Sequence, residues 1–466
     1  MNETNIKIEA RLSELTAHMA ERAEAALLEL LAIPSYQGEA AEGAPFGAEP
    51  ARALAKAADL AEELGLAVTR TDHYITADLG DGTSPDTVGV LCHADVVPFG
   101  DGWHFSPTGE SVDGKIYGRG ALDDKGPLVA SLFALAAIRE LDLPMARPVR
   151  IIIGANEESG SRCMQKYVAE ASIPAFGFSP DANFPVIYAE KGIALMQAAA
   201  QVTPGKVISL HAGTVVNAVP GKAEAVLRAI DAETIRQIAN ECAAKITVEQ
   251  LPTGDIKLTA IGKAAHGSQP EKGINAAALL LTLLAALPLD DAESRHISNI
   301  SRLFGSDHHG EAAGIACTDE VSGKLTLNLG KIDWEGDRCV LALDMRYPVT
   351  APFAEIYSNL TGITEANSLE LSLDEHKPPL YVPRDQEPVT TLLELYREYS
   401  PGAEALAIGG GTYCRSFRNF VAFGPLRETT ADLMHQADEY ITQQDFAFLR
   451  QIYAQAIWRL AGQIND

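Results

Sequence analysis

The chain is 466 residues long, and 47% of its residues are hydrophobic while 21% are charged. A chain of this length is too large for one ordinary core, so we expect two or more globular domains. The formal net charge of −26 argues against binding to nucleic acid or docking on anionic membranes, because both partners attract a basic protein face.

The N-terminal part of the chain predicts an α/β domain. Helices are predicted at about 10–32 and 51–64, and strands at 67–71, 74–79, 87–92 and 115–117. Lys125 and Gly126 open a long apolar helix that reaches about Leu141, with Pro127 in its first turn, where the missing N–H costs nothing. The predicted strand at 149–155 is largely apolar on both faces, as a sheet covered by helices requires.

The pattern changes near Gly192, after which strands and helices occur in separate runs. Strands are predicted at 193–202, 216–230, 324–331 and 338–346, and helices at 233–246 and 274–287. Such runs are typical of an α+β domain. A proline-rich segment at 376–388 is predicted to return the chain to the first domain. We therefore predict one domain from residues 1–191 plus 385–466, and an inserted domain at 192–384.

The N-terminal residues lack the apolar core of a signal peptide, and no stretch is long and apolar enough to span a bilayer. The cysteines form no CxxC pair, and most stand in apolar surroundings, which favours reduced buried thiols over disulfides or zinc ligands. These features predict a cytoplasmic protein. The six cysteines are Cys92, Cys163, Cys242, Cys317, Cys339 and Cys414.

Histidine and acidic residues gather just after predicted buried strands. His93 and Asp95 follow the strand that ends near residue 92, and Glu157 and Glu158 follow the strand that ends near residue 155. Between them, the stretch 118–126 carries two further adjacent acids, Asp123 and Asp124. In α/β sheets, ligands collect at such strand ends, and these residue types are the ingredients of a metal site built from several loops.

Taken alone, each motif is weak, because a His-x-Asp pair is more often structural and two adjacent glutamates are more often solvated. However, a ligating histidine commonly has its other ring nitrogen held by a carboxylate, and the two-residue spacing brings Asp95 to the same side as His93. Adjacent acids at the rim of a core repel each other unless a cation is present. A pair of divalent ions would resolve this repulsion, which predicts a metallohydrolase.

Five motifs in a fixed order carry a resemblance to a known family. The sequence resembles the co-catalytic di-zinc exopeptidases, which include aminoacylase, glutamate carboxypeptidase, succinyl-diaminopimelate desuccinylase and carnosinase-like dipeptidases, and bacterial dipeptidases are its most similar members. The resemblance covers nearly the whole chain and implies an α/β catalytic domain, with a mixed sheet covered by helices as in phosphorylase/hydrolase-like folds, and an inserted α+β lid. The motifs are His93-Ala94-Asp95, residues 118–127, residues 156–160, Ser179-Pro180-Asp181 and residues 434–439.

The resemblance also implies a role for each residue of the catalytic domain. His93 and Asp181 would hold one metal ion, Glu158 and His435 would hold the other, and Asp123 would bridge the two. Asp95 would orient His93, Asp124 would be a non-ligating acid, and Glu157 would be the general base. Two divalent ions per chain are implied, zinc first, with manganese or cobalt as alternatives because histidine and carboxylate ligands accept several metals.

Three residues of the inserted domain match lid residues of the family. Asn217 matches the lid asparagine, His266 the histidine that reaches the oxyanion, and Arg346 the arginine that binds the substrate's terminal carboxylate, a bidentate task suited to guanidinium. Without the resemblance they would be interpreted as a strand-edge amide, a loop histidine and a surface ion pair. Gly409-Gly410-Gly411 could approach substrate closely or form a plain turn.

These features predict a metal-dependent dipeptidase that hydrolyses dipeptides with a free C-terminal carboxylate, through a water held between two metals and activated by Glu157. One alternative is an N-acyl-amino-acid deacylase or desuccinylase, which the large lid of about 190 residues disfavours. The other is a peptide-binding protein that has lost its metals, which the full set of ligands disfavours. We expect a small peptide as the only partner and a functional monomer, because a lid this long can hold two lobes.

Overall fold

The computed structural model describes residues 3–241 and 245–463, which form two compact units. The first unit consists of the residues up to Tyr188, Tyr381–Leu406 and the residues from Gly411 onward. The second unit consists of Ala189–Leu380 and Ala407–Gly410. The boundaries that we predict at 191/192 and 384/385 stay a prediction, as does the assignment of one domain to catalysis and the other to a lid. Ala407–Gly410, which we predict in the first domain, groups with the second unit.

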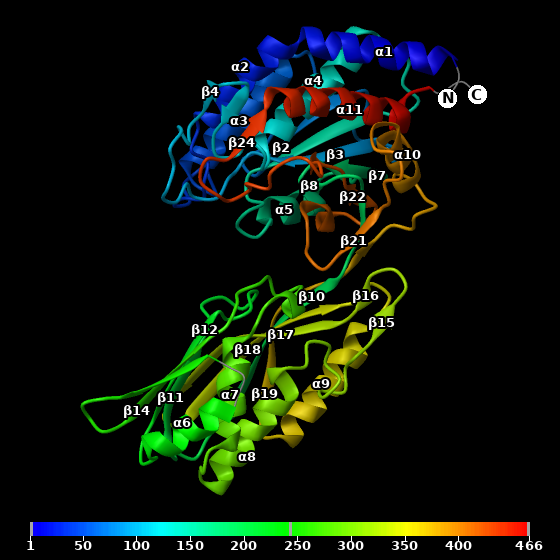
Figure 1. The fold of residues 1–466 in the computed structure, drawn as a ribbon. Helices are drawn as coiled ribbons and strands as arrows, with labels where there is room; N and C mark the ends of the chain where they lie inside the picture. Colours follow the sequence, from blue (N-terminus) through cyan, green and yellow to red (C-terminus); the bar gives the residue numbers. More distant parts are fainter. Residues whose placement is uncertain (1–2, 242–244, 464–466) are drawn as a thin grey trace. The chain divides into compact units, whose positions relative to one another are not determined.

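The first unit is an α/β structure (Figure 1). Its helices are α1 (Glu3–His18), α2 (Ala20–Leu31), α3 (Ala48–Glu63), α4 (Lys125–Glu140), α5 (Arg162–Glu170), α10 (Val389–Tyr399) and α11 (Gln443–Ala461), with a 3-10 turn at Tyr413–Ser416. Its strands, three of which run across the unit boundaries, are β1 (Ala67–Arg70), β2 (Tyr74–Leu79), β3 (Val88–His93), β4 (Glu110–Val112), β5 (Lys115–Tyr117), β6 (Val149–Gly154), β7 (Phe176–Ser179), β8 (Ala182–Asn183), β9 (Ile187–Glu190), β20 (Leu380–Tyr381), β21 (Leu406–Ile408), β22 (Phe420–Ala422), β23 (Pro425–Leu426) and β24 (Tyr440–Thr442).

The main sheet of this unit is mixed, which confirms the predicted fold class. Its strand order is β1-β2-β6-β3-β7-β22-β9-β20, and β6, β3 and β7 are neighbouring parallel strands. All six residues of β3 and of β6 are buried, because helices cover the sheet. Helices α4 and α11 pack on each other and against β3, and α1 and α2 pack on α4 (Figure 1).

The helix that we predict at about 10–32 is two helices, α1 and α2, with Met19 between them. Near the end of α1, the Thr16 hydroxyl donates to the main-chain oxygens of Leu12 and Ser13, at 2.9 and 3.1 Å. A hydroxyl bonded back to the preceding turn competes with the helical ladder and favours a bend or an end. Periodicity alone could not locate this break, since apolar residues continue across it.

Arg150 is the one charged residue of β6, and its charge is matched. Its Nε and Nη2 donate to the two carboxylate oxygens of Asp78 on the neighbouring strand β2, at 2.7 and 2.9 Å. Both side chains are at most 10% exposed. A buried guanidinium is tolerated in a sheet when a carboxylate accepts from it in this two-bond geometry.

The second unit is an α+β structure. Its helices are α6 (Ala232–Glu241), α7 (Ala276–Ala286), α8 (Asp291–Ile300) and α9 (Phe353–Ala366), with a 3-10 turn at Pro270–Lys272 and a π turn at Ser301–Gly305. Its strands are β10 (Gly192–Gln201), β11 (Val207–Ala212), β12 (Lys222–Leu227), β13 (Ile246–Gln250), β14 (Ile256–Ile261), β15 (Thr318–Asp319), β16 (Gly323–Lys324), β17 (Thr326–Glu335), β18 (Arg338–Tyr347) and β19 (Glu370–Lys377).

Eight of these strands form one antiparallel sheet in the order β13-β14-β12-β11-β17-β18-β10-β19. The apolar helix α7 packs on β12 and β14 and buries most of its residues in the core of this unit. Of the strand predicted at 216–230, only β12 is a strand. Residues 213–221 form a loop instead, because Gly213 takes a positive φ of 70° and Pro220 has no N–H to donate to a ladder.

The described residues include no helix that is long and apolar enough to cross a membrane. Cys92, Cys163, Cys317 and Cys339 are free thiols, and burial raises the pKa of Cys92 well above its usual value. Cys242 lies outside the described residues.

Candidate active site

The carboxyl ends of three adjacent parallel strands carry most of the candidate residues. His93 is the last residue of β3, Glu157 and Glu158 follow β6, and Asp181 follows β7. Because β6, β3 and β7 run parallel side by side, their carboxyl ends share one edge of the sheet. The sequence therefore brings these side chains together through strand direction.

Two groups of side chains at this edge could hold a metal ion, one of His93, Glu157 and Asp181, and one of His93, Asp123 and Glu158. Within each group, one potential ligand atom per residue lies within 4.8 Å of the others. His435 lies beside the second group, with its Nε2 3.0 Å from Asp123 and 3.2 Å from Glu158. The structure thus places together all of the predicted ligands in the first unit.

The ring orientation of His93 suits metal binding. Its Nδ1 is 3.0 Å from the main-chain oxygen of Asp95, and since a carbonyl oxygen can only accept, Nδ1 carries the proton. The lone pair of the neutral ring is then on Nε2, which faces Asp123 at 3.0 Å and Asp181 at 3.8 Å. A hydrogen bond at one ring nitrogen that leaves the other free toward carboxylates is the arrangement of a ligating histidine.

Asp95 acts differently from the prediction. The hydrogen bond to His93 comes from its main-chain oxygen, whereas its carboxylate is 3.6 Å from the ring. That carboxylate instead accepts the main-chain N–H groups of Glu157 and Glu158, at 3.0 and 3.2 Å. Asp95 therefore fixes both the histidine and the loop that carries the two glutamates, which the spacing of residues in the sequence could not reveal.

Asp124 is completely buried and does not face the candidate ligands. One of its carboxylate oxygens accepts the main-chain N–H of His93 at 3.1 Å. Burial raises its pKa well above the usual value, with repulsion from Asp181 and Asp123 acting in the same direction. This placement fits the non-ligating role that the resemblance implies, and it shows the carboxyl supporting the end of β3.

The carboxylates of the cluster repel one another. Burial and the neighbouring Asp123 raise the pKa of Asp181 to about 7. Burial and Asp181 raise the pKa of Glu157 well above its usual value, and burial also raises that of Glu158. Burial opposes ionisation of Asp123 as well, but hydrogen bonds from His435 and His93 lower its pKa. Divalent cations would remove this repulsion, so the chemistry of the donor set fits a metal centre.

Comparison with known proteins identifies the family. The model of peptidase family M20/M25/M40 matches residues 89–459, a span that includes every candidate site residue. The chain belongs to this family. It is therefore a peptidase, a hydrolase that acts on peptide bonds, and the predicted family resemblance is confirmed. Particular closeness to the bacterial dipeptidase PepV stays a prediction.

Individual relatives agree with the family match. The Bacillus subtilis (strain 168) protein named "Putative dipeptidase YtjP" is 38% identical over 449 residues, covering 93% of this chain and 96% of its own. The structure is also similar to that of human carnosine dipeptidase 1, with a TM-score of 0.59, 16% identity, and coverage of 97% and 98%. An aminoacylhistidine dipeptidase from Vibrio alginolyticus gives a TM-score of 0.57, 14% identity, and coverage of 92% and 95%. The two structures show that the fold is shared.

The second unit of this peptidase brings its three candidate residues to one place. The N–H of Gly267 donates to the main-chain oxygen of Asn217 at 2.7 Å, which ties the His266 turn to the Asn217 loop. A Cβ at Gly267 would lie 2.5 Å from a carboxylate oxygen of Asp344, the partner of Arg346. Asn217, His266 and Arg346 therefore surround one glycine that has no room for a side chain.

Asp344 holds Arg346 rigidly. Arg346 donates from Nε and Nη2 to the two carboxylate oxygens of Asp344, at 2.6 and 2.9 Å, and from Nη1 to the main-chain oxygen of Gly409 at 3.2 Å. A guanidinium has five N–H groups, so two remain beyond these three bonds, one on each terminal nitrogen. A carboxylate of a substrate could accept from both.

His266 is poised as a neutral donor. Its Nδ1 accepts the N–H of Ser268 at 3.1 Å, so the proton of the neutral ring is on Nε2. Partial desolvation and the charge of Arg346 lower the pKa of His266, which keeps the ring neutral at physiological pH. A neutral imidazole with an exposed Nε2–H suits the stabilisation of an oxyanion.

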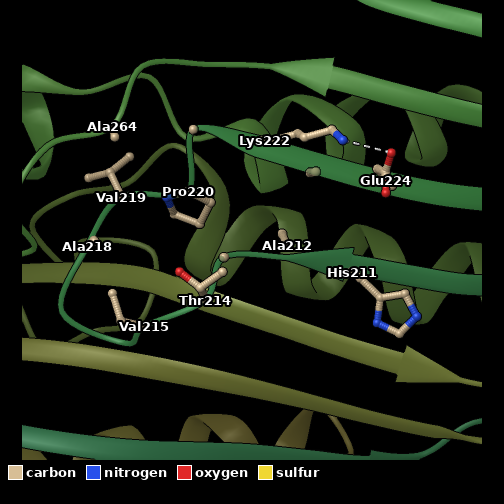
Figure 2. Close-up of a pocket in the computed structure, with 13 residues that line it drawn as sticks. His211, Ala212, Thr214, Val215, Ala218, Val219, Pro220, Lys222, Glu224 and Ala264 are labelled. Atoms are coloured by element: carbon tan, nitrogen blue, oxygen red, sulfur yellow. Dashed lines mark ion pairs between the residues drawn. The ribbon is translucent and has the colours of Figure 1, made fainter. Parts of the chain in front are cut away.

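A pocket of about 340 Å³ in the second unit is lined in part by neighbours of Asn217 and His266, such as Ala218 (Figure 2). Val215, Val219, Pro220 and Ala264 line its apolar part. At its other end Lys222 forms an ion pair of 3.0 Å with Glu224, which Figure 2 shows as a dashed line. None of the candidate site residues lines this pocket, so we assign it no function.

Several residues that support the site are not among those predicted from the sequence. Asp344 stands two residues before Arg346 on the same strand face, and this period-two spacing was a usable signal. Asn328 donates to the main-chain oxygens of Val216 and Ala218, on either side of Asn217, and no local signal could have revealed it. Tyr413 packs edge-on against the His93 ring with 5.8 Å between ring centroids.

The crowding at Gly267 gives a test of the second-unit cluster. Gly267→Ala should lower kcat/KM by about 100-fold, because the new Cβ must displace Asp344 or the Asn217 main chain, and a displacement of about 1 Å is that costly. Gly362→Ala is the matched control, since this helical glycine has open space around it and should retain full activity. Equal activity of the two variants would contradict the proposed importance of the cluster.

Proposed function

We propose that this peptidase is a metal-dependent dipeptidase that hydrolyses dipeptides with a free C-terminal carboxylate. The observation that carries the proposal is the cluster of His93, Asp123, Glu158, Asp181 and His435 at the edge of the sheet in the first unit. The names of the similar proteins, which include several dipeptidases, support the same substrate class.

Two divalent cations, zinc first, would bind these residues. His93 and Asp181 would hold one ion, Glu158 and His435 the other, with Asp123 shared by both. When bound, such ions polarise the scissile carbonyl and lower the pKa of water, so that water is a nucleophile at neutral pH.

Glu157 would move the protons. It stands next to the ligand Glu158, and the Asp95 carboxylate fixes its main chain. As a general base it would take a proton from the attacking water at its carboxylate and deliver that proton to the departing amine.

The second unit would supply substrate recognition. The Arg346 N–H groups that do not bond to Asp344 would bind the free C-terminal carboxylate of the substrate. N-blocked amino acids also carry such a carboxylate, whereas peptide amides do not. Asn217 would hydrogen-bond the substrate. His266 would donate from Nε2 to the oxyanion that develops on the scissile carbonyl.

A substrate screen tests the proposal directly. Protein reconstituted with Zn²⁺, Mn²⁺ or Co²⁺ should hydrolyse dipeptides in preference to tripeptides and N-acetyl amino acids, and should reject dipeptide amides. The measurement is the rate at which free amine is released, determined by chromatography. A preference for N-acetyl or N-succinyl amino acids would instead establish the deacylase alternative. If the protein binds dipeptides but hydrolyses none of them with any of the three metals, it is the peptide-binding protein of the other alternative.

The role of Glu157 is tested by its replacement. Glu157 is also near enough to His93 and Asp181 to be a ligand, so both functions must be measured. Glu157→Ala should keep the fold and two bound metals but lose turnover by two to four orders of magnitude, roughly the contribution of a general base. Loss of one equivalent of metal on elemental analysis would make Glu157 a ligand, and near-normal activity would remove it from the mechanism.

We propose further that the active species is a monomer. The eight-stranded sheet of the second unit forms within one chain, with β11 and β17 joining two halves of four strands each. A mixture of inactive Glu157→Ala and inactive His266→Ala chains should therefore remain inactive. Recovery of activity on mixing would mean that His266 acts on the substrate of a second chain, and the active species would then be a dimer.

A further inference from the structure

One buried carboxylate connects the loops that carry Asp123 and His435. Strand β24 pairs antiparallel with β5, with Tyr440 opposite Tyr117. The next residues outward in this register are Glu439 and Gly118, and the Gly118 N–H donates to the main-chain oxygen of Glu439 at 2.9 Å. The pairing thereby directs the side chain of Glu439 along the segment that leads to Asp123.

The carboxylate of Glu439 organises that segment. Its Oε1 accepts three main-chain N–H groups, from Gly120 at 3.1 Å, Leu122 at 2.8 Å and Asp123 at 3.2 Å. Residues 118–124 belong to no helix or strand, so their N–H groups have no ladder to join. Glu439 is completely buried, and the three bonds take the place of a regular element for this loop.

The charge of Glu439 is balanced by Arg119. Arg119 Nη1 donates to the Oε2 of Glu439 at 2.7 Å, and its Nη2 donates to the main-chain oxygen of Phe99 at 3.2 Å. Its guanidinium also lies 5.2 Å from the ring centre of Trp103. Both ends of the ion pair are therefore held by further contacts, and neither side chain can move without breaking them.

Asp438, the residue before Glu439, holds a second loop. One carboxylate oxygen of Asp438 accepts the N–H groups of His104 and Phe105, at 2.7 and 3.1 Å. His435 stands four residues before Glu439 and has a positive φ of 63°, a conformation that a non-glycine residue keeps only when its surroundings impose it. Asp438 and Glu439, three and four residues after His435, fix the chain at the end of this turn.

We propose that Glu439 is a positioning residue that fixes the spacing between Asp123 and His435 and so sets the affinity of the metal centre. The proposal rests on the proposed function, in which both of these residues are ligands. A carboxylate is required because a single oxygen must accept three N–H groups while the other faces a cation. Partners that orient metal ligands in this way typically contribute about 10- to 100-fold to metal affinity.

Two conservative variants separate the effect of the length of the Glu439 side chain from the effect of its charge. Glu439→Asp keeps the charge but is one methylene shorter, so it cannot reach Arg119 and the three N–H groups together. Glu439→Gln keeps the length and one carbonyl oxygen, but it turns an amide N–H₂ toward Arg119 or toward the loop. Both should bind metal about 10- to 100-fold more weakly than the wild type.

The metal affinity is measured by competition with a chromophoric chelator for Zn²⁺, and the ligand geometry by the visible absorption of the Co²⁺-loaded protein. Asp123→Ala serves as the reference for loss of the shared ligand. At saturating metal, the KM for a dipeptide should change less than twofold in both Glu439 variants, because the buried Glu439 carboxylate is bonded to Arg119 and to the main chain of residues 120–123, to none of which we assign a contact with substrate.

The control is Asp78→Asn, which disrupts a different buried ion pair of the same unit, the two-bond pair with Arg150. It should lower the urea midpoint of unfolding but leave the Zn²⁺ affinity and Co²⁺ spectrum unchanged. If Glu439→Asp and Glu439→Gln behave like this control, Glu439 is only structural and the proposal is wrong. If Glu439→Gln does not fold, the Zn²⁺ affinities of Glu439→Asp and Arg119→Lys decide whether the proposal holds. A wild-type protein that binds no metal would instead contradict the proposed function.

Discussion

Repulsion between buried acids is the constraint on which this structure depends. Asp123, Glu157, Glu158 and Asp181 lie together at one sheet edge, and burial makes it costly for all of them to be charged. The chain opposes this repulsion with two histidines beside Asp123 and with hydrogen bonds to the main chain, such as those that Asp95 accepts. Much of the surrounding architecture serves to hold like charges in place until a cation is bound.

Two features of the fold hold the candidate ligands in place: the direction of the strands and a network of hydrogen-bonded carboxylates. The parallel strands β6, β3 and β7 deliver His93, Glu158 and Asp181 to one edge, which needs no special contact beyond the sheet itself. Asp123 comes from an irregular loop, which Glu439 anchors by accepting the Asp123 N–H. Asp95 anchors the loop that carries Glu157 and Glu158 in the same way. In the second unit, Asp344 and Asn328 have the same relation to Arg346 and Asn217.

The sequence predicted the fold class, the central strands and the family, because these depend on apolar runs and on motifs of adjacent residues. It did not predict the break at Met19, the strand β11 or the loop before β12, where local hydrogen bonds and glycine conformation override the apolar pattern. The predicted site residues of the first unit lie close together, but the sequence did not indicate the positioning role that we propose for Glu439. Its three N–H partners are more than 300 residues away in the chain, and no spacing rule connects them.

The first unit is interrupted by the second, and this has a consequence for biosynthesis. A nascent chain that has emerged only as far as residue 380 contains His93, Asp123, Glu158 and Asp181, but it lacks His435, Glu439 and the strand β24 that pairs with β5. The N–H groups of Gly118, Gly120, Leu122 and Asp123 then lack the acceptors that Glu439 provides. The complete donor set can therefore assemble only after the ribosome has translated nearly the entire chain, which delays peptide hydrolysis until the second unit, to which we assign substrate recognition, has been made.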